Sequence, residues 1–367
     1  GAVVIDIGTR CSKAGFSGQL TPSAEISTLQ GCPMTRPSGL EEDKSQAFIG
    51  GEAFLSSATE MTEPMQNGII VNWQAAESLL QQLFEQKLQV PPEEYALLIS
   101  EPPLSPSSHR EKMMEVAFES LGSPGFFVAH QPVLATYAHG RTSGLVVNVG
   151  YAASWAVPVH EGYSLAHATT RMELAGSHLS WYLMTLLGGR KSMLSKEIVY
   201  VVEDMKHECC YVASNFKSEC KVPPGRKSLA FALPDGKTIT LNKERFQCPE
   251  VLFNPPPDWA VSYGGIHEMA QRSLEQVPEE IRSTLYKNIF LCGGSTLFEG
   301  LERRFFNELL QSLPPDTKVG VAAMPWRLYS AWTGGSILAS LDNFQKCWIQ
   351  RDEYCEEGPR IVHQRCY

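Results

Sequence analysis

Two short, almost wholly apolar runs recur along the chain, each ending in an acidic or amide residue with glycine two positions later. Residues 2–8 read Ala-Val-Val-Ile-Asp-Ile-Gly, and residues 145–150 read Leu-Val-Val-Asn-Val-Gly. Each run is followed by a turn and a second apolar stretch, at residues 14–16 and 155–159. Such runs predict buried strands. The sequence therefore predicts two β-hairpins about 142 residues apart, a spacing too long for a solenoid and typical of two related α/β halves.

The segments between the strands show helical spacing. Asn72 is expected to cap a helix, and residues 108–111 (Ser-His-Arg-Glu) predict a capping box before another. Residues 96–99 predict a short buried strand, so strands alternate with helices and indicate an α/β fold with a substantial parallel component. Residues 31–47 are rich in Gly, Pro, Ser, Glu and Asp and predict an exposed loop or a small subdomain, and residues 254–265, which hold three consecutive prolines and a glycine pair, predict a surface loop. The apolar positions of the first helix are Trp73, Ala76, Leu80, Leu83 and Phe84.

Composition narrows the class of protein. The chain has 367 residues, of which 43% are hydrophobic, and this length allows two domains or one large bilobal unit. Its 40 acidic and 31 basic residues give a net charge of −9, which argues against a nucleic-acid-binding surface spread over the molecule. Because no run of about 18 apolar residues occurs, no membrane span is expected. No signal peptide is visible, and we expect a short N-terminal piece outside this numbering.

The cysteines give a further indication about the compartment. Ten are scattered along the chain without a CxxC pair, which indicates reduced thiols in a cytosolic or nuclear protein. A zinc site is an alternative, although its four residues lack paired spacing. They are His207, Cys209, Cys210 and Cys220.

Several segments resemble the actin family, in the family's order and over nearly the whole chain. Residues 329–341 (Tyr-Ser-Ala-Trp-Thr-Gly-Gly-Ser-Ile-Leu-Ala-Ser-Leu) carry the clearest likeness. The divergence points to an actin-like protein, most similar to the male-germ-cell actin-like group. Other matching segments are Lys13-Ala-Gly-Phe16, Asn67-Gly-Ile-Ile70, Gly140-Arg-Thr142, Leu233-Pro-Asp-Gly236 and Gly293-Gly-Ser-Thr296.

The resemblance implies the actin-like fold, in which two ribonuclease-H-like α/β domains, divided into four subdomains, surround a central interlobe cleft that binds nucleotide. It also accounts for the duplicated hairpin. The implied bounds are residues 1–27, 64–138 and 330–367 for subdomain 1, 28–63 for subdomain 2, 139–174 and 262–329 for subdomain 3, and 175–261 for subdomain 4.

The first hairpin keeps most of the family's phosphate and magnesium residues. Asp6, Gly8, Thr9 and Lys13 match them. Arg10 stands where the family places glycine, which lets the backbone approach an anion. Arg10 can form an ion pair with a phosphate of the nucleotide. Alternatively, it can fill the site, pair with Asp6 and obstruct nucleotide binding.

The second hairpin departs further from the family. Asn148 replaces an aspartate and supplies neither a general base nor a charge for hydrated Mg²⁺. Tyr151 and Ala152 add bulk to a tight phosphate turn, and Trp155 replaces a histidine and has no titratable nitrogen. Gln131, which matches the glutamine that orients the attacking water, is retained.

On the nucleoside side, retained and altered positions are mixed. Each lost contact commonly costs about 1–3 kcal/mol, so we expect nucleotide affinity several orders of magnitude below an intact site, and a pseudo-ATPase with absent or residual hydrolysis. No cofactor and no metal are expected; the alternative is ATP or ADP with magnesium. Lys206, Gly293 and Gly294 are retained, whereas His207, Phe298 and Leu328 replace family residues.

The implied assembly surfaces also differ. The loop that joins family filaments corresponds to residues 38–44, whose tip is acidic and resists burial. Residues 257–261 correspond to an apolar plug of altered shape, so a conventional homofilament is not expected. The family's partner groove keeps its apolar character and can dock an amphipathic helix, although Leu338 and Phe344 singly are read as ordinary core residues. The groove residues are Tyr137, Gly140, Thr142, Leu338, Leu341 and Phe344.

Three functions follow from the resemblance. The leading one is a non-catalytic structural subunit or scaffold of a cytoskeletal assembly, in the cytoplasm and, by resemblance, in the sperm head or flagellum. The alternatives are an ATP-binding actin that polymerises or caps filaments, and an actin-related subunit of a nuclear chromatin complex. No run of five or more Lys or Arg supports the last. A sugar kinase or chaperone ATPase of the same superfold is disfavoured by residues 329–341 and by Asn148.

Overall fold

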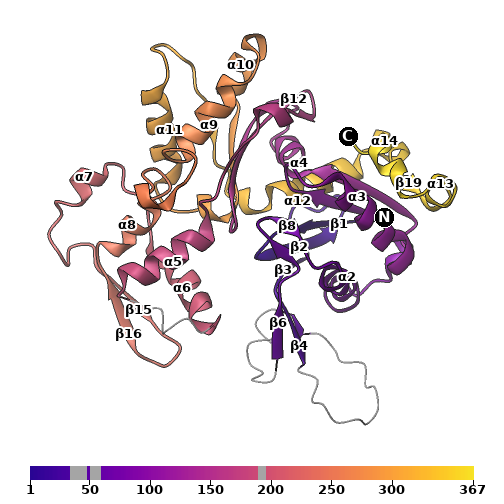
Figure 1. The fold of residues 1–367 in the computed structure, drawn as a ribbon, viewed down its shortest axis with the longest axis horizontal. Helices are drawn as coiled ribbons and strands as arrows, with labels where there is room; N and C mark the ends of the chain where they lie inside the picture. Colours follow the sequence, from indigo (N-terminus) through magenta and orange to yellow (C-terminus); the bar gives the residue numbers. More distant parts are fainter. Residues whose placement is uncertain (34–47, 50–58, 189–195) are drawn as a thin grey trace. The chain divides into compact units, whose positions relative to one another are not determined.

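The computed structural model describes residues 1–33, 48–49, 59–188 and 196–367. The chain divides into two compact units (Figure 1). Unit 1 holds residues 1–142, 161–166 and 329–367, and unit 2 holds residues 143–160 and 167–328. Of the loop expected at residues 31–47, residues 31–33 belong to a strand, and the rest lies outside the described residues together with the acidic tip at 41–43.

Unit 1 is built on a mixed sheet. In its described part, six strands lie in the order β19-β10-β9-β1-β2-β3. The central strand β1 is parallel to β9 and antiparallel to β2, and all six of its residues are buried. Their bounds are β1 Ala2–Ile7, β2 Cys11–Phe16, β3 Ala24–Ser27, β9 Ala96–Glu101, β10 Gly125–His130 and β19 Ile349–Gln350. The smaller strands are β4 Gln30–Pro33, β5 Phe48–Ile49, β6 Thr59–Thr62, β7 Met65–Gln66, β8 Ile69–Ile70 and β13 Tyr163–Ser164.

Unit 2 repeats this arrangement, as the two hairpins predicted. Its strands lie in the order β14-β12-β11-β17-β18, with β11 antiparallel to β12 and parallel to β17. The α/β fold with a substantial parallel component is therefore confirmed, and so is the internal duplication. The bounds are β11 Gly144–Val149, β12 Ser154–His160, β14 Thr170–Met172, β17 Ile289–Cys292 and β18 Val321–Ala322. A separate hairpin joins β15 Leu229–Ala232 to β16 Thr238–Leu241.

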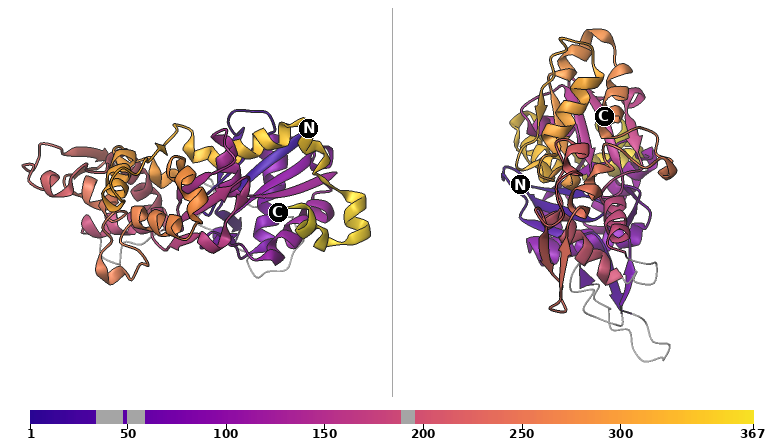
Figure 2. Two further views of the ribbon diagram at one scale, coloured as in Figure 1. Left: turned by 90° about the horizontal axis from the view of Figure 1, so that it is seen from above. Right: turned by 90° about the vertical axis from the view of Figure 1, so that its left-hand side faces the viewer.

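Helices cover the strands within each unit. The yellow C-terminal helices lie beside the indigo and purple strands of unit 1, the unit to which they belong (Figure 2). Unit 1 holds α2 Trp73–Gln82, α3 Ser107–Glu115, α4 Gln131–Ala138, α12 Ser330–Ser340, α13 Arg351–Glu357 and α14 Val362–Arg365, with π-helical turns at Leu83–Leu88 and Val116–Ser120. Unit 2 holds α5 Gly176–Leu186, α6 Lys196–Cys209, α7 Phe216–Glu219, α8 Glu244–Glu250, α9 Ile266–Glu275, α10 Glu279–Tyr286 and α11 Leu301–Ser312. Short 3-10 turns lie at Pro92–Glu94, Ala166–Ala168, Pro257–Trp259, Gly294–Thr296, Arg327–Tyr329, Asp342–Lys346 and Pro359–Ile361.

The two predicted helix starts have different outcomes. Asn72 caps α2 as expected, because its Oδ1 accepts a hydrogen bond from the backbone N of Ala75 at 3.0 Å. The capping box predicted at residues 108–111 is wrong. Helix α3 starts one residue earlier, at Ser107, and Pro106 occupies the cap position without a capping side chain among the described residues. Pro106 has a ψ of 134° and therefore lies outside the helix, and proline also disfavours helical backbone at the residue before it, so the helix starts directly after Pro106.

Close backbone packing fixes α12 in unit 1. A Cβ added to Gly334 of α12 would lie 1.7 Å from the carbonyl oxygen of Leu134 in α4. On the same helix, Trp332 is fully buried, and its Nε1 donates to the carbonyl oxygen of Val4 at 2.9 Å. Glycine therefore allows α12 and α4 to touch at their backbones while the tryptophan ties α12 to β1. Within the described residues, none of the helices has the length and apolar character needed to cross a bilayer.

Candidate functional site

The first hairpin places a cluster of polar side chains around Asp6 at the end of β1 in unit 1. Asp6 is 6% exposed, and its Oδ2 lies 3.6 Å from the Nζ of Lys13. Ser100 Oγ donates to Asp6 Oδ1 at 2.5 Å, and Gln131 Nε2 donates to the same oxygen at 3.0 Å. The carboxyl ends of the parallel strands β1 and β9 meet at one sheet edge, which brings these side chains together. Sequence reasoning named three of the four and missed Ser100, although a polar residue at the end of a predicted buried strand was a usable signal.

The turn after β1 is held by Thr28, the residue that follows β3. Thr28 Oγ1 donates to the carbonyl oxygen of Gly8 at 2.6 Å, and Thr28 N donates to the carbonyl oxygen of Arg10 at 2.9 Å. A Cβ on Gly8 would lie 2.6 Å from the carbonyl oxygen of Cys11. The fold therefore requires glycine at this position even without a ligand. Thr9 and Arg10 are half-buried.

Asp6 is the one acid among the four members of this cluster, the others being Lys13, Ser100 and Gln131. Among the described residues, no three His, Cys, Asp or Glu side chains are grouped to bind one. The four residues of the alternative zinc site, at positions 207, 209, 210 and 220, thus do not form one. A lone carboxylate still suits magnesium that keeps its waters and is held mainly by phosphates. The geometry therefore fits a magnesium ion that Asp6 would contact through bound water. It does not fit a magnesium ion that is coordinated directly by several protein side chains.

The second hairpin carries the altered residues in unit 2. Asn148 on β11 lies directly opposite Trp155 on β12. Trp155 is 6% exposed, and the guanidinium carbon of Arg171 on β14 lies 4.5 Å from its ring centroid. An indole that is packed in this way is a structural element and takes no proton. The side chains of Tyr151 and Ala152, in the turn between the strands, are half-buried.

The turn after β11 is bound to the start of α5. The backbone N of Gly176 donates to the carbonyl oxygen of Gly150 at 2.9 Å, and that of Ser177 donates to the carbonyl oxygen of Tyr151 at 2.8 Å. The Oγ of Ser295 also donates to the carbonyl oxygen of Gly150, at 2.8 Å. Backbone N–H groups at a helix start can bind an anion. Here these two already donate to the protein's own carbonyl groups.

The retained glycines of unit 2 have a structural reason of their own. Gly293 has a φ of 92°, and a Cβ there would lie 2.4 Å from the carbonyl oxygen of Val149. Arg327 holds the same turn, because its Nε donates to Thr296 Oγ1 at 3.1 Å and its Nη2 to the Thr296 carbonyl at 3.0 Å. No motif or spacing in the sequence indicated that Arg327 would hold this turn. Close to Gly294 lies Leu328, 3.4 Å from the position of an added Cβ.

Lys206 lies inside unit 2. It is 1% exposed, and its Nζ donates to Glu203 Oε1 at 2.9 Å, to Ser180 Oγ at 2.8 Å and to the carbonyl oxygen of Gly176 at 2.9 Å. Glu203 was missed, although an acid three residues before a lysine on one helix is a recognisable pair. His207 is exposed, with its Nε2 3.6 Å from Glu203 Oε2, and Phe298 is buried. The cation that the resemblance assigns to nucleotide is thus already paired within the protein.

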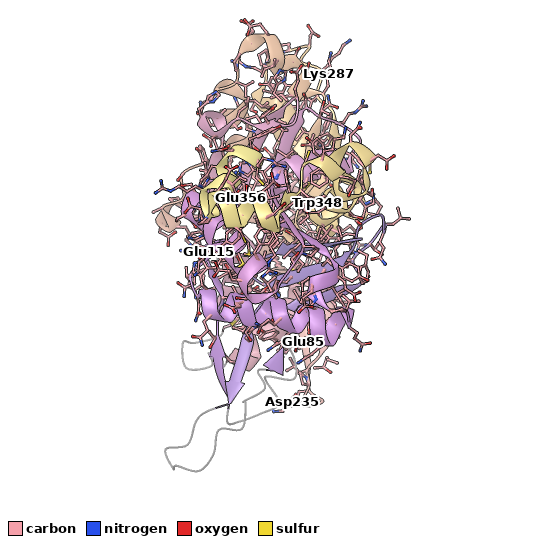
Figure 3. All side chains as sticks on the ribbon, turned by 90° about the vertical axis from the view of Figure 1, so that its right-hand side faces the viewer. Glu85, Glu115, Asp235, Lys287, Trp348 and Glu356 are labelled. Atoms are coloured by element: carbon pink, nitrogen blue, oxygen red, sulfur yellow. The ribbon has the colours of Figure 1, made fainter. Side chains whose placement is uncertain are left out.

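The six predicted groove residues all lie in unit 1, on or next to α4 and α12, but they differ in accessibility. Phe344 is buried against Phe127, with ring centroids 4.8 Å apart, and against Trp348, which Figure 3 labels, at 5.0 Å. Its interpretation as a core residue is confirmed. Leu341 is 49% exposed, and sequence reasoning missed Ile337, which is 40% exposed. Tyr137 and Leu338 are half-buried, and Gly140 and Thr142 are exposed.

A charged cluster near the end of β9 makes unit 1 sensitive to acid. Glu101 Oε2 accepts from Arg110 Nε at 2.7 Å and lies 3.2 Å from His130 Nε2. Burial by itself raises the pKa of Glu101, but the hydrogen bonds from His130 and Arg110 outweigh it and leave the pKa below 4.5. The carboxylate therefore stabilises the fold above pH 4.5, and this stability is lost as the pH falls through the lower pKa of the folded state.

Replacing Glu101 with glutamine should lower the free energy of unfolding at pH 7 by about 2 kcal/mol, because charge-assisted hydrogen bonds are lost. The deficit should shrink as the pH falls below 4.5, where the wild-type carboxyl becomes protonated. Urea denaturation of both proteins at several pH values measures this difference. A deficit that stays constant with pH would mean that the charge of Glu101 plays no part.

Comparison with known proteins places the chain in a family. The family model described as Actin matches residues 1–367. Actin-like protein 9 of Bos taurus and that of Homo sapiens are each 47% identical over 367 residues, which cover 100% of this chain and 88% of each relative. Actin-like protein 7A of Homo sapiens is 40% identical over 367 residues, covering 100% of this chain and 84% of the relative. The chain therefore belongs to the actin family.

Proposed function

We propose that this chain is a non-catalytic structural member of the actin family, with weak or absent nucleotide binding and absent or residual hydrolysis. We place it as a subunit or scaffold of a cytoskeletal assembly in male germ cells, following the sequence resemblance to that group. The observation that carries the proposal is the pairing of Asn148 with Trp155 across the second hairpin. Neither side chain can accept the proton of an attacking water.

The retained glutamine does not replace the missing base. Gln131 donates to Asp6 and, at 3.3 Å, to Ser100 Oγ, so its amide nitrogen already has protein partners. An amide can orient a water but cannot take its proton at neutral pH. Hydrolysis therefore lacks a general base among the residues that the resemblance assigns to it.

Weak binding is supported by the positions of the charged groups. The ammonium group of Lys206 is fully buried and bonded to Glu203, so a phosphate or ribose contact would have to displace an internal ion pair. The alternative of an ATP-binding, filament-forming or capping protein is favoured by the intact Asp6–Lys13–Gln131 cluster. Because the family uses both hairpins to bind phosphates, we give the altered second hairpin more weight.

Titration of the full chain with MgATP tests the proposal. We expect a Kd of about 1 mM or weaker and no stoichiometric nucleotide in protein purified without added ATP. A variant that restores the family residues (R10G/N148D/Y151D/A152G/W155H) should bind at least about 100-fold more tightly, since several lost contacts are regained.

Two controls make this experiment decisive. Thr142→Ser changes an exposed residue outside both hairpins and should leave the affinity unchanged. Gln131→Ala should leave phosphate release at the background rate. Stoichiometric ATP or ADP in the native protein would overturn the binding half of the proposal. Turnover that Gln131→Ala abolishes would overturn the catalytic half.

A further inference from the structure

One segment of unit 2 has a charge opposite to that of the chain. Residues 216–246, from α7 to α8 and including the β15–β16 hairpin (Figure 1), contain seven basic and three acidic residues, whereas the whole chain carries −9. The proposed function does not use this segment. Its basic residues are Lys217, Lys221, Arg226, Lys227, Lys237, Lys243 and Arg245.

Two of the cations lie over the ring of Tyr211. Lys227 Nζ lies 5.6 Å and Arg245 Cζ 5.0 Å from the ring centroid of Tyr211, whose hydroxyl donates to Glu219 Oε1 at 2.5 Å. Lys227 also forms an ion pair with Glu219. Arg245 Nε donates to the carbonyl oxygen of Cys209 at 2.7 Å. These contacts bring α7, the loop before β15 and the start of α8 to one place.

The acids of the segment are already engaged. Glu219 binds Lys227 and Tyr211, Asp235 lies 3.3 Å from Lys237 at the turn of the β15–β16 hairpin (Asp235 is labelled in Figure 3), and Glu244 Oε2 accepts from the backbone N of Asn242 at 2.7 Å. Glu219 and Asp235 are paired with cations, whereas Glu244 keeps its negative charge, and the seven basic and three acidic residues leave the segment with a net charge of +4. Two acids outside the segment add negative charge, Glu208 beside Cys209 and Glu299 beside Tyr211.

Four cations therefore face solvent with no acid of their own. Lys217, Lys221, Arg226 and Lys243 are exposed, and no ion pair joins them to an acid within the described part of the chain. Each lies within two residues of a member of the Tyr211 cluster. Unpaired surface charges of one sign attract a ligand of the other sign and speed its association. We call these four residues the basic patch.

We propose that the basic patch is a docking surface for a short acidic segment of a partner protein. Charge complementarity selects an acidic ligand. The net charge of −9 on the whole chain repels extended polyanions. A short acidic peptide is affected mainly by the positive charges of the basic patch, because salt screens the more distant charges. Proteins bind single-stranded nucleic acids by stacking the bases on aromatic side chains. The ring of Tyr211 already lies against Lys227 and Arg245 and is not free for such stacking. In this segment Leu229 is 38% exposed and no larger apolar face accompanies it, which disfavours insertion into a bilayer.

Fluorescence anisotropy tests the proposal by measuring the binding of a labelled peptide of about eight glutamates to the full chain. The measurement is made without nucleotide, at about 50 and about 150 mM NaCl. The variant K217Q/K221Q/R226Q/K243Q should bind the peptide about tenfold more weakly than the wild type, with a smaller dependence on salt. Because the assay contains no nucleotide, its outcome does not depend on whether the chain binds ATP.

A matched variant controls for net charge. K287Q/R303Q/K318Q/K346Q removes four exposed cations elsewhere, including Lys287 (labelled in Figure 3), and should bind the peptide like the wild type. Equal melting temperatures of the variants exclude misfolding as the cause. The proposal is overturned if the wild type does not bind the peptide, or if both variants lose equal affinity. It is also overturned if phosphatidylserine vesicles or an oligonucleotide bind the patch more tightly than the peptide.

Discussion

Replacing Gly334 with alanine is expected to lower the free energy of unfolding of unit 1 by about 3 kcal/mol or more. In an exposed helix the same change would stabilise by about 1 kcal/mol, because glycine is a poor helix former. Here the new methyl group would lie 1.7 Å from the carbonyl oxygen of Leu134, a backbone atom that cannot rotate away. Helices α12 and α4 must then separate, and the effect of the mutation changes sign.

Urea denaturation followed by circular dichroism measures this loss. Ser340→Ala serves as the control, since it places an alanine at an exposed position of the same helix. The two helices carry Tyr137 and Leu338 of the predicted partner groove, so the groove should be disturbed together with the core. If Gly334→Ala were as stable as the wild type, the close contact between α12 and α4 would not be required for folding.

Arg304→Met should destabilise unit 2 by about 3–5 kcal/mol, because it leaves a buried carboxylate without its partner. Arg304 and Glu250 are each 4% exposed and form two hydrogen bonds of 2.9 Å with each other. Arg304 also donates to Glu308 at 2.7 Å and packs on Phe253, with the guanidinium carbon 4.9 Å from the ring centroid. Methionine can fill the volume but cannot neutralise Glu250.

A second substitution distinguishes charge from packing. In the double variant Arg304→Met/Glu250→Met, the unpaired carboxylate is also removed, so part of the lost stability should return. Arg303→Met, at the exposed neighbouring position, should change the unfolding free energy by less than about 0.5 kcal/mol. Thermal or urea unfolding of the four proteins gives the comparison. A double variant that is less stable than Arg304→Met alone would contradict this account.

The sequence predicted what depends on local pattern. The apolar runs at residues 2–8 and 145–150 are central strands, because the residues of β1 and most of those of β11 are buried. The cap at Asn72 was found because a helix start has a local chemical requirement. The start of α3 was misplaced by one residue, since serine and glutamate at the right spacing look like a capping box even where proline precedes them.

Partners distant in the chain were not visible in the sequence. Ser100 reaches Asp6 across 94 positions, and Arg304 reaches Glu250 across 54. Their pairing depends on strand order and helix packing, for which one sequence gives no register. Sequence reasoning therefore found the residues that match a family motif, such as Asp6 and Lys206, and missed the side chains that hold them.

The buried pair of Lys206 and Glu203 has a consequence for the life of the protein in the cell. A protein whose buried charge is neutralised by a ligand gains stability in proportion to the logarithm of the ligand concentration, and its folded fraction follows that supply. In unit 2 the neutralising group is part of the chain, 2.9 Å away. We therefore expect the amount of folded protein to be independent of ATP levels.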